Sequence, residues 1–294
     1  MSTNSQRAEG PPWTIMNLLT WTSGYLKKHL VENPRASAEV MLAHCLGCKR
    51  IDLYLRHDQP MQKEELAQFR KLVKRRVAGE PVAYIVGCKE FWSLEFKVDG
   101  SVLIPRPDSE CLVETAVLLF ADRPDLKVLE LGCGSGAISI AMAHERPGWR
   151  FLALDRSYDA IRVARANARH HHLDERIQFM VSDWFAALGN SKFDLIVTNP
   201  PYIKTEEIDT LPTEIRCYEP RLALDGGIDG TASLSLIIRS SPSYMVSGGV
   251  MVTEIGSDQR PAVCEIVRKC SRYRDIDFKK DFGGLDRVAV LTSS

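Results

Sequence analysis

The sequence of 294 residues contains no apolar run of about 18 residues, so it predicts no transmembrane helix. Its first dozen residues are polar and contain proline and glycine, whereas a secretory signal needs an apolar segment and an organellar signal an arginine-rich amphipathic one. Internal repeats and low-complexity segments are absent as well. These absences predict a cytoplasmic protein that does not associate with a membrane.

The sequence also gives little sign of a disulfide scaffold or a metal centre. Its eight cysteines are scattered, and a reducing compartment would leave them as thiols. Cys45 and Cys48 form a lone C-x-x-C pair without a second pair at zinc-ligand spacing, so we expect buried or helix-end thiols there. His170, His171 and His172 lack a partner at metal-ligand spacing too, and we expect them in a solvated loop at a helix end.

The sequence has no net charge, because 38 basic side chains balance 38 acidic ones. Together with the lack of an interleaved basic and aromatic surface, this argues against direct nucleic-acid binding. The balance is uneven: residues 1–90 hold 14 Lys and Arg against 9 Asp and Glu, or +5, and the remainder holds 24 against 29, or −5. This asymmetry is compatible with a partner-binding first domain, but most of the excess lies in Lys71, Lys74, Arg75 and Arg76, for which a solvated helix face is the favoured explanation.

What is present begins with a helical part. Apolar side chains recur at helical spacing in four segments, which are residues 15–30, 37–47, 51–55 and 62–79. Ser37 is expected to cap the second of these helices. We therefore predict a small helical bundle, residues 1–80, followed by a linker of residues 81–105 in which residues 83–86 and 91–98 pair as a β-hairpin.

From residue 106 to residue 294 the pattern changes to alternating strands and helices, which predicts an α/β domain with a mostly parallel sheet covered on both faces. The expected strands are residues 127–131, 151–155, 177–181, 194–198 and 250–254. The expected helices are residues 137–143, 159–168, 234–245 and 262–270. Residues 273–278 and 287–291 are expected to form a C-terminal antiparallel hairpin.

A glycine-rich turn follows the first expected strand and opens a helix; its residues are Gly132, Cys133, Gly134, Ser135 and Gly136. Glycines let the backbone approach a ligand closely, and the helix N-terminus supplies N–H donors. The spacing G-x-G-x-G differs from the G-x-G-x-x-G of dinucleotide sites, which disfavours a nicotinamide cofactor. A purely structural turn is the alternative.

Acidic residues follow the next two expected strands. Asp155, 19 residues after Gly136, is placed to accept hydrogen bonds from both hydroxyls of a ribose, or else to cap the next helix. Asp183 is placed to accept a hydrogen bond from an adenine amino group while Trp184 packs on the ring. The alternative for this second pair is a helix-initiating aspartate beside a core tryptophan.

The fourth expected strand ends in Asn199, Pro200, Pro201 and Tyr202. The two prolines lack backbone N–H donors and hold Asn199 extended, so its side chain and the nearby carbonyls are left to accept hydrogen bonds. Tyr202 adds an aromatic face. The set suits a planar NH₂ group, whose two protons need acceptors and whose plane packs against a ring, although Asn-Pro also punctuates simple strand-to-loop turns.

Because the carboxyl ends of parallel strands meet at one sheet edge, these four elements are expected to surround a single site. Together they resemble the class I S-adenosylmethionine-dependent methyltransferases, and the tetrapeptide is similar to that of the amino-methylating members. Residues 79–87, Glu90 with Phe91, residues 102–110 and residues 219–224 further resemble the protein-glutamine methyltransferases of peptide release factors, the HemK/PrmC family. The resemblance covers almost the whole chain, with Ser109 where family members usually carry threonine.

The resemblance implies a Rossmann-like methyltransferase domain with S-adenosylmethionine held by Gly132 to Gly136, Asp155, Asp183, Trp184 and Asn199. It implies that Asn199 to Tyr202 bind the glutamine of a Gly-Gly-Gln motif, with Asn199, Pro200 and Tyr202 in catalytic roles. It further implies methyl transfer to the N5 nitrogen of that glutamine in a release factor, a helical domain that recognises the substrate, and a monomer. Residues 203–230 are expected to contribute to a substrate-facing loop.

An amide nitrogen is a poor nucleophile, because its lone pair is delocalised into the carbonyl. If the Asn199 side-chain oxygen and the Pro200 carbonyl accept its two protons, the nitrogen is aimed at the methyl group and its developing charge is stabilised, so no general base is assigned. Three alternatives remain open: a glutamine methyltransferase of a ribosomal protein, a nucleic-acid amino-methyltransferase, and a cofactor-binding module without catalysis.

Overall fold

The computed structural model describes residues 13–294, so the polar stretch expected at the start of the chain lies outside the described residues. The chain divides into two compact units, Met1–Val86 and Gly87–Ser294. Among the described helices, none combines the length and apolar character that crossing a bilayer requires.

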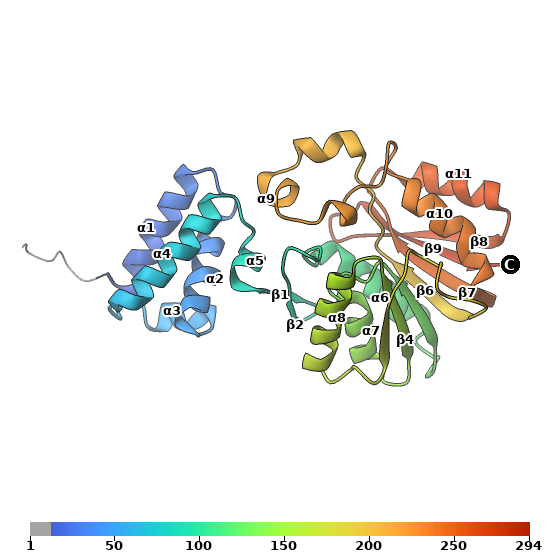
Figure 1. Ribbon diagram of the computed structural model, residues 1–294, viewed down its shortest axis with the longest axis horizontal. Helices are drawn as coiled ribbons and strands as arrows, with labels where there is room; N and C mark the ends of the chain where they lie inside the picture. The colour runs from blue at the N-terminus through green and yellow to red at the C-terminus, as the bar shows by residue number, and fades with distance from the viewer. Residues whose placement is uncertain (1–12) are drawn as a thin grey trace, which may run out of the picture. The chain divides into compact units, whose positions relative to one another are not determined.

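The first unit is helical, as expected. Its described helices are α1 (Ile15–Lys28), α2 (Pro34–Leu46), α3 (Arg50–Leu55), α4 (Lys63–Val77) and α5 (Val82–Val86) (Figure 1). The apolar positions of these segments meet in one core that contains Leu19, Leu42, Leu53 and Phe69. Burial of those side chains, rather than helix propensity, holds such short helices in place.

Two expectations for this region were wrong, and a third is confirmed only in part. Helix α2 begins at Pro34 and not at Ser37, because the fixed φ of proline suits the first helical position. Residues 83–86 are helical and not a strand: the Tyr84 and Ile85 amides both donate to the Pro81 carbonyl, at 3.1 and 3.0 Å. The solvated basic face expected on α4 is present at Lys71, Lys74 and Arg75, which are exposed, whereas Arg76 is buried and donates to the Glu80 carbonyl at 3.0 Å.

The second unit opens with a short hairpin, β1 (Cys88–Phe91) with β2 (Leu94–Lys97), and continues into a seven-stranded sheet. The strands of that sheet are β3 (Lys127–Leu131), β4 (Arg150–Asp155), β5 (Ile177–Val181), β6 (Phe193–Thr198), β7 (Met245–Glu254), β8 (Tyr273–Lys280) and β9 (Asp286–Ser293). Their spatial order is β5-β4-β3-β6-β7-β9-β8, and all neighbours from β5 to β7 run parallel. Strand β9 is antiparallel to β7 and β8, which confirms the predicted C-terminal hairpin.

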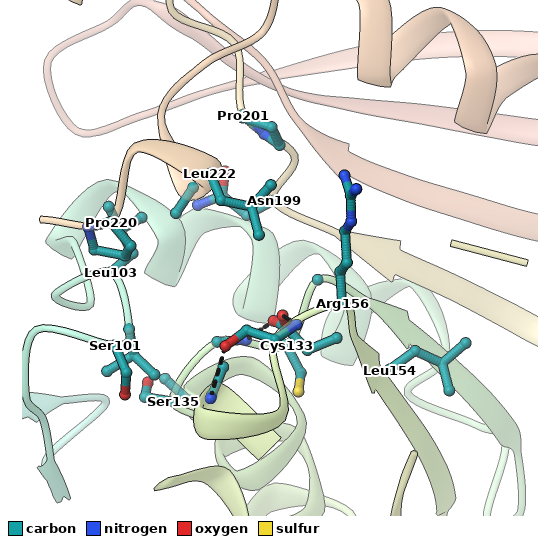
Figure 2. Close-up of a pocket in the computed structure, with 18 of the residues that line it drawn as sticks. Ser101, Leu103, Cys133, Ser135, Leu154, Arg156, Asn199, Pro201, Pro220 and Leu222 are labelled. Carbon is teal, nitrogen blue, oxygen red and sulfur yellow. Dashed lines mark hydrogen bonds between the residues drawn. The ribbon is translucent and has the colours of Figure 1, made fainter. Parts of the chain in front are cut away.

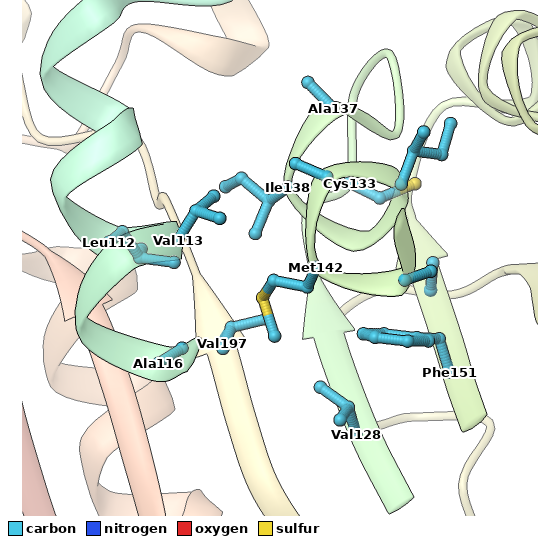
Figure 3. Packing of buried hydrophobic residues seen from close by; sticks show 14 of the residues in the cluster. Leu112, Val113, Ala116, Val128, Cys133, Ala137, Ile138, Met142, Phe151 and Val197 are labelled. Carbon is cyan, nitrogen blue, oxygen red and sulfur yellow. The ribbon is translucent and has the colours of Figure 1, made fainter. Parts of the chain in front are cut away.

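Helices cover both faces of this sheet (Figure 1). The helices of the unit are α6 (Glu110–Leu119), α7 (Ala137–Glu145), α8 (Tyr158–His170), α9 (Thr213–Arg216), α10 (Ala232–Ser240) and α11 (Arg260–Cys270). On one face, Val113 of α6 and Met142 of α7 pack with Val128, Phe151 and Val197 of the sheet (Figure 3). On the other face, residues of α10 and α11 pack against a second apolar cluster. The result confirms the predicted three-layer α/β architecture.

Two helix predictions differ from the structure. The helix expected over residues 234–245 ends at Ser240, because Pro242 starts a separate short turn and Met245 already belongs to β7. The helix α6 was not among those expected. The solvated helix end expected at the three histidines is present only in part. His170 and His172 are exposed, whereas His171 is half-buried: its Nε2 atom lies 2.8 Å from the Glu95 carbonyl, and its ring packs against Phe96 of the hairpin.

The topology places a binding crevice at a defined point of the sheet. Strands β3, β4 and β5 proceed outward in one direction, whereas β6 lies on the opposite side of β3. Loops that leave β3 and β6 therefore diverge and open a gap at the carboxyl edge, where doubly wound sheets bind ligands. The glycine-rich turn follows β3 and the Asn-Pro-Pro-Tyr segment follows β6, so both lie at this switch point.

Candidate functional site

A cavity of about 660 Å³ occupies that edge of the sheet (Figure 2). It is lined by the loops after β3, β4, β5 and β6, together with residues 100–109 and 220–225, which precede α6 and α10. Its size is in the range of pockets that hold nucleoside-sized ligands. The expected substrate-facing loop, residues 203–230, contributes Pro220, Leu222, Ala223 and Asp225 to the wall.

The glycine-rich turn forms the floor of the cavity. Gly132, Cys133, Gly134 and Ser135 line it, and a side chain added at Gly134 would meet no atom within 4 Å, so this backbone faces open space. Gly136 has a different role. Its φ of +79° is left-handed, and an added Cβ would lie 3.2 Å from the Ala164 Cβ, so glycine here permits the close packing of α7 on α8.

Asp155 lies at the end of β4 and lines the same cavity. Its Oδ2 atom accepts from the Gly134 amide and its Oδ1 atom from the Ser157 amide, both at 2.8 Å. Burial raises the pKa of Asp155, and these two backbone hydrogen bonds oppose that rise. The carboxylate thus fixes the glycine-rich turn while its remaining lone pairs stay available to a ligand.

The segment after β5 supplies one polar and one aromatic side chain. Asp183 is exposed and Trp184 half-buried, and both line the cavity. The Trp184 ring lies against the turn, since an added Cβ on Gly132 would be 3.6 Å from its Cζ3 atom. Trp184 takes a left-handed φ of +47°, and the Ser182 hydroxyl donates to its carbonyl at 2.9 Å. This arrangement presents an aromatic face beside the polar floor.

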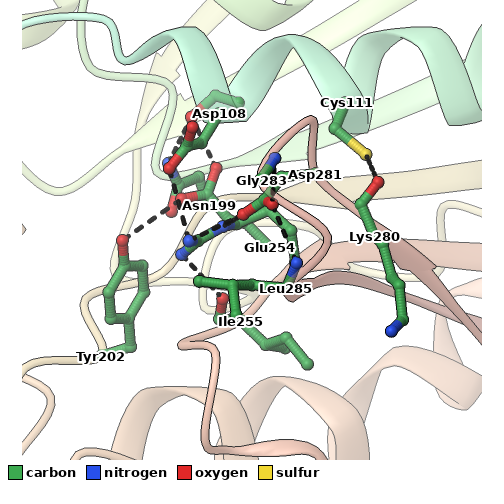
Figure 4. A network of polar contacts seen from close by, with 12 residues as sticks. Asp108, Cys111, Asn199, Tyr202, Glu254, Ile255, Lys280, Asp281, Gly283 and Leu285 are labelled. Carbon is green, nitrogen blue, oxygen red and sulfur yellow. Dashed lines mark hydrogen bonds and ion pairs between the residues drawn. The ribbon is translucent and has the colours of Figure 1, made fainter.

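Asn199 and Pro201 line the cavity on the side of β6, whereas the buried Pro200 and the half-buried Tyr202 do not line it. The Asn199 Nδ2 atom donates to the Ser109 hydroxyl at 3.1 Å, and the Tyr202 hydroxyl donates to Glu254 Oε1 at 3.3 Å (Figure 4). Burial, followed by the charge of Glu254, raises the pKa of Tyr202 to about 12. Tyr202 therefore stays a neutral hydroxyl at ordinary pH.

Glu254 is the centre of this polar network. It ends β7 and is almost fully buried, and its Oε2 atom accepts from the Ser109 hydroxyl at 2.5 Å. Burial raises the pKa of Glu254, while the Ser109 hydrogen bond and the charge of Arg287 oppose the rise. Arg287 is held in turn by Asp281 at 3.0 Å and Asp108 at 3.3 Å.

An ion pair with a buried carboxylate joins two walls of the cavity. Arg106, from the segment before α6, pairs with Glu219, from the segment before Pro220 and Leu222. The Glu219 side chain is 1% exposed and the Arg106 side chain 35% exposed, so the pair joins those two loops with its carboxylate buried and its guanidinium partly in solvent.

Sequence reasoning missed the roles of Glu254, Arg106 and Glu219. Glu254 carried a usable signal, because it ends a parallel strand at the same sheet edge as Asp155 and Asn199. Arg106 and Glu219 lie 113 positions apart, and neither has a local pattern that predicts the partner. Ser109 was noticed only as a departure from a family pattern, and its contact with Asn199 is long-range.

The residues present fit an S-adenosylmethionine-like ligand. Asp155 offers carboxylate oxygens for hydroxyl groups, and Trp184, Leu154 and Ile138 offer an apolar wall for a base. The glycine-rich turn offers a floor without side chains at Gly132 and Gly134. Among the described residues no cluster of His, Cys, Asp and Glu is arranged to hold a metal ion.

Comparisons with known proteins agree with this geometry. The family described as "PrmC N-terminal domain" matches residues 17–87, and the family described as "Methyltransferase small domain" matches residues 109–216. The chain is 41% identical over 276 residues to a release factor glutamine methyltransferase of Geobacter sulfurreducens, which covers 94% of this chain and 95% of the relative. It is 38% identical over 292 residues to the protein of the same name from Rhodopirellula baltica, which covers 98% and 99%.

A solved structure shares the fold at low identity. It is the Thermus thermophilus 16S rRNA N2 G1207 methyltransferase in complex with AdoMet and guanosine, with a TM-score of 0.51 and 17% identity over 70% of this chain and 50% of that chain. This likeness supports the methyltransferase architecture of the sheet.

Proposed function

Because this chain belongs to the release factor glutamine methyltransferases, we propose that it transfers a methyl group from S-adenosylmethionine to the N5 amide nitrogen of the glutamine in the Gly-Gly-Gln motif of a release factor. The observation that carries the proposal is the position of Asn199, which lines the cavity and whose side-chain amide donates a hydrogen bond to the Ser109 hydroxyl. A side-chain amide at the wall of a nucleoside-sized cavity suits recognition of another amide.

We assign the cofactor to the part of the cavity formed by Gly132 to Gly136, Asp155, Asp183, Trp184 and Asn199. Gly132 and Gly134 allow close approach, Asp155 accepts hydrogen bonds from ribose hydroxyls, and Asp183 accepts one from the adenine amino group. Trp184 packs against the purine ring. Gly136 contributes indirectly, since it sets the packing of α7 that supports the turn.

When bound, S-adenosylmethionine supplies an electrophilic methyl group on a sulfonium. The side-chain oxygen of Asn199 and the backbone carbonyl of Pro200 accept the two N–H protons of the substrate amide, which turns its nitrogen lone pair toward that methyl group. As positive charge develops on the nitrogen, the same two oxygens stabilise it. As the N–C bond forms, the bond between the methyl group and the sulfur breaks and leaves a neutral thioether. The excess proton on the nitrogen then passes to water, so no side chain is needed as a general base. Pro201 lines the cavity beside the substrate amide, and Tyr202 fixes the end of the tetrapeptide through its hydrogen bond to Glu254.

We further propose that the helical unit docks the release factor. A glutamine amide offers few atoms for recognition, so choosing one glutamine in one protein requires contacts far from the reacting nitrogen. The unit carries the positive excess of the chain, and exposed Trp21, Ile51 and Leu55 add apolar surface. The enzyme is proposed to act as a monomer in the cytoplasm, where release factors work.

The test offers methyl-labelled S-adenosylmethionine and enzyme to release factor, ribosomes, transfer RNA and DNA in parallel. We expect label on the release factor alone, and its loss when the Gly-Gly-Gln glutamine is replaced. Label on a ribosomal protein or on nucleic acid alone would overturn the proposed substrate. Absence of label from all four, with intact cofactor binding, would instead indicate a binding module.

A further inference from the structure

We propose that Ser109 and Glu254 are positioning residues that hold the Asn199 amide with its oxygen toward the substrate. The inference rests on the proposed function, because it specifies how the acceptor that function requires is oriented. It is carried by a chain of three side chains from different segments: Glu254 at the end of β7, Ser109 at the start of α6, and Asn199 after β6 (Figure 4).

The first step concerns the hydroxyl of Ser109. Ser109 occupies the N-cap position of α6, where serine usually caps its own helix, yet its side chain makes no cap hydrogen bond. It donates instead to Glu254 Oε2 at 2.5 Å, across a sequence distance of 145 residues. An ionised carboxylate only accepts hydrogen bonds, so the single hydroxyl hydrogen of Ser109 is committed to Glu254.

The second step concerns Asn199. A hydroxyl whose hydrogen is already committed has only lone pairs to offer, so it accepts from Asn199 and cannot donate to it. The Asn199 Nδ2 atom must therefore face Ser109, at the observed 3.1 Å, and the Oδ1 atom is left on the opposite side of the amide. Asn199 lines the cavity, so this orientation gives the cavity an acceptor rather than a donor.

The third step concerns what keeps Glu254 in its accepting state. Its Oε1 atom accepts from the Tyr202 hydroxyl at 3.3 Å while its Oε2 atom accepts from Ser109, so one carboxylate contacts the Tyr202 end of the Asn-Pro-Pro-Tyr segment directly and the Asn199 end through Ser109. The positive charge of Arg287 favours the ionised form of Glu254, and ion pairs with Asp281 and Asp108 hold the Arg287 guanidinium in place. Glu254 is 1% exposed, so water does not compete for these contacts.

The orientation has a direct chemical consequence. If the Asn199 amide turned over, its NH₂ group would meet the NH₂ group of the substrate glutamine, and two donors would face each other. That pairing repels the nitrogen that must be methylated and offers nothing to its developing charge. The Ser109 hydroxyl thus selects the productive orientation, although it does not itself touch the substrate.

The experiment compares Ser109→Ala, Ser109→Thr and Glu254→Gln with the parent, and uses Ser241→Ala as the matched control. Ser241 is a fully buried serine of the same unit whose hydroxyl donates to the Ile237 carbonyl, away from the cavity. We expect Ser109→Ala to lower kcat on release factor roughly three- to tenfold, the effect of one hydrogen bond, while KM and the Kd for S-adenosylmethionine change less than about twofold. Ser109→Thr should restore kcat, and Glu254→Gln should lower it.

A second readout does not depend on methyl transfer. In protein labelled with ¹⁵N-asparagine, the Asn199 side-chain NH₂ signal, identified by its loss in Asn199→Ala, should exchange slowly with water in the parent and fast in Ser109→Ala. Equal kcat and equal exchange in the parent and Ser109→Ala would overturn the positioning role. A parent enzyme that fails on release factor but shows the protected NH₂ signal would contradict the proposed substrate and leave the positioning inference supported.

Discussion

The two units of this chain shift the pKa of a buried carboxylate in opposite directions. In the helical unit, Glu39 accepts from Arg35 and Arg50, both at 2.6 Å, and from the Tyr54 hydroxyl. Burial alone would raise the pKa of Glu39, but these hydrogen bonds and the Arg50 charge outweigh burial and lower it to about 2. The carboxylate is ionised at any ordinary pH and joins side chains of α2 and α3.

The second unit, Gly87–Ser294, is here called the catalytic unit. Its buried Glu130 forms no ion pair with a Lys or Arg of the described residues. Its Oε2 atom accepts from the amide and the hydroxyl of Ser139, and within the described part of the chain its Oε1 atom has no hydrogen-bond partner. Burial raises the pKa of Glu130 to about 8, which the Ser139 hydrogen bonds only partly oppose. Glu254, nearer the cavity, is also shifted upward by burial.

The difference indicates what each unit is built for. Glu39 contributes stability, because its charged form is satisfied by two cations. Glu130 and Glu254 sit where a charge is costly, and they fix segments at the cavity: Glu130 anchors the start of α7, and Glu254 holds Ser109 and Tyr202. Functional sites often retain such destabilising groups for their positional effect.

The largest expected effect falls on the catalytic unit. Asn199→Ala should lower kcat at least about a hundredfold, the scale of losing one group that stabilises a transition state, while S-adenosylmethionine affinity changes much less. Single-turnover rates at saturating release factor measure it, and Asn190→Ala, on an exposed loop, is the matched control. Rates equal to those of the parent would remove Asn199 from the mechanism.

Asp155→Ala should weaken S-adenosylmethionine binding by about 1–3 kcal/mol, because hydrogen bonds to the ribose are lost and the Gly134 amide loses its acceptor. Calorimetric titration of the cofactor measures the change. The exposed Asp174, changed to alanine, should leave the affinity as it is. An Asp155→Ala protein with the affinity of the parent would exclude the ribose role.

Removal of the helical unit sharpens the comparison by asking what that unit adds. A chain of residues 87–294 should keep its cofactor affinity but lose about tenfold or more of its kcat/KM on intact release factor, because docking contacts are missing. A short Gly-Gly-Gln peptide should be a poor substrate for both chains. Circular dichroism first establishes that the shortened chain is folded; equal kcat/KM on intact release factor would then refute the docking role.

The smallest effects test the carboxylates directly, by the same substitution in each unit. Glu39→Gln should destabilise the helical unit by about 1–3 kcal/mol at pH 7, because two guanidinium groups lose their partner. The Glu39 pKa is lowered from 4.5 to about 2 on folding, so its stabilisation is present above pH 4.5 and is lost as the pH falls toward 2. The difference in the free energy of unfolding between parent and variant should shrink as the pH falls from 4.5 toward 2.

Glu130→Gln should change the free energy of unfolding in the opposite direction and stabilise its unit. The Glu130 pKa is raised from 4.5 to about 8 on folding, so its cost is absent below pH 4.5 and grows as the pH rises through 8. Glutamine keeps an oxygen for Ser139 and carries no charge, so the variant should gain stability relative to the parent between pH 5 and pH 9, roughly. Amide hydrogen exchange read separately in each unit measures both variants. If both substitutions stabilised their units, or both destabilised them, the proposed difference between the two carboxylates would be wrong.

Much of the fold followed from periodicity, because buried parallel strands such as β3 and β6 are short apolar runs that end in turn residues. Proline explains three of the errors: Pro34 moved the start of α2, Pro81 made a helical turn before the hairpin, and Pro242 ended α10 early. Local spacing predicts which residues follow strands, and topology then brings Asp155, Asp183 and Asn199 to one cavity. It does not predict pairs such as Ser109 with Glu254, whose contact exists only after the sheet has formed.

The central claim is that Asn199 directs methyl transfer to one glutamine amide of a release factor. The most direct measurement is peptide mass spectrometry of intact release factor after equal incubation with S-adenosylmethionine and either the parent enzyme or Asn199→Ala. The account predicts a single methyl group on the Gly-Gly-Gln glutamine with the parent, and almost none with the variant. A methyl group on another residue, or equal methylation of that glutamine by Asn199→Ala, would contradict it.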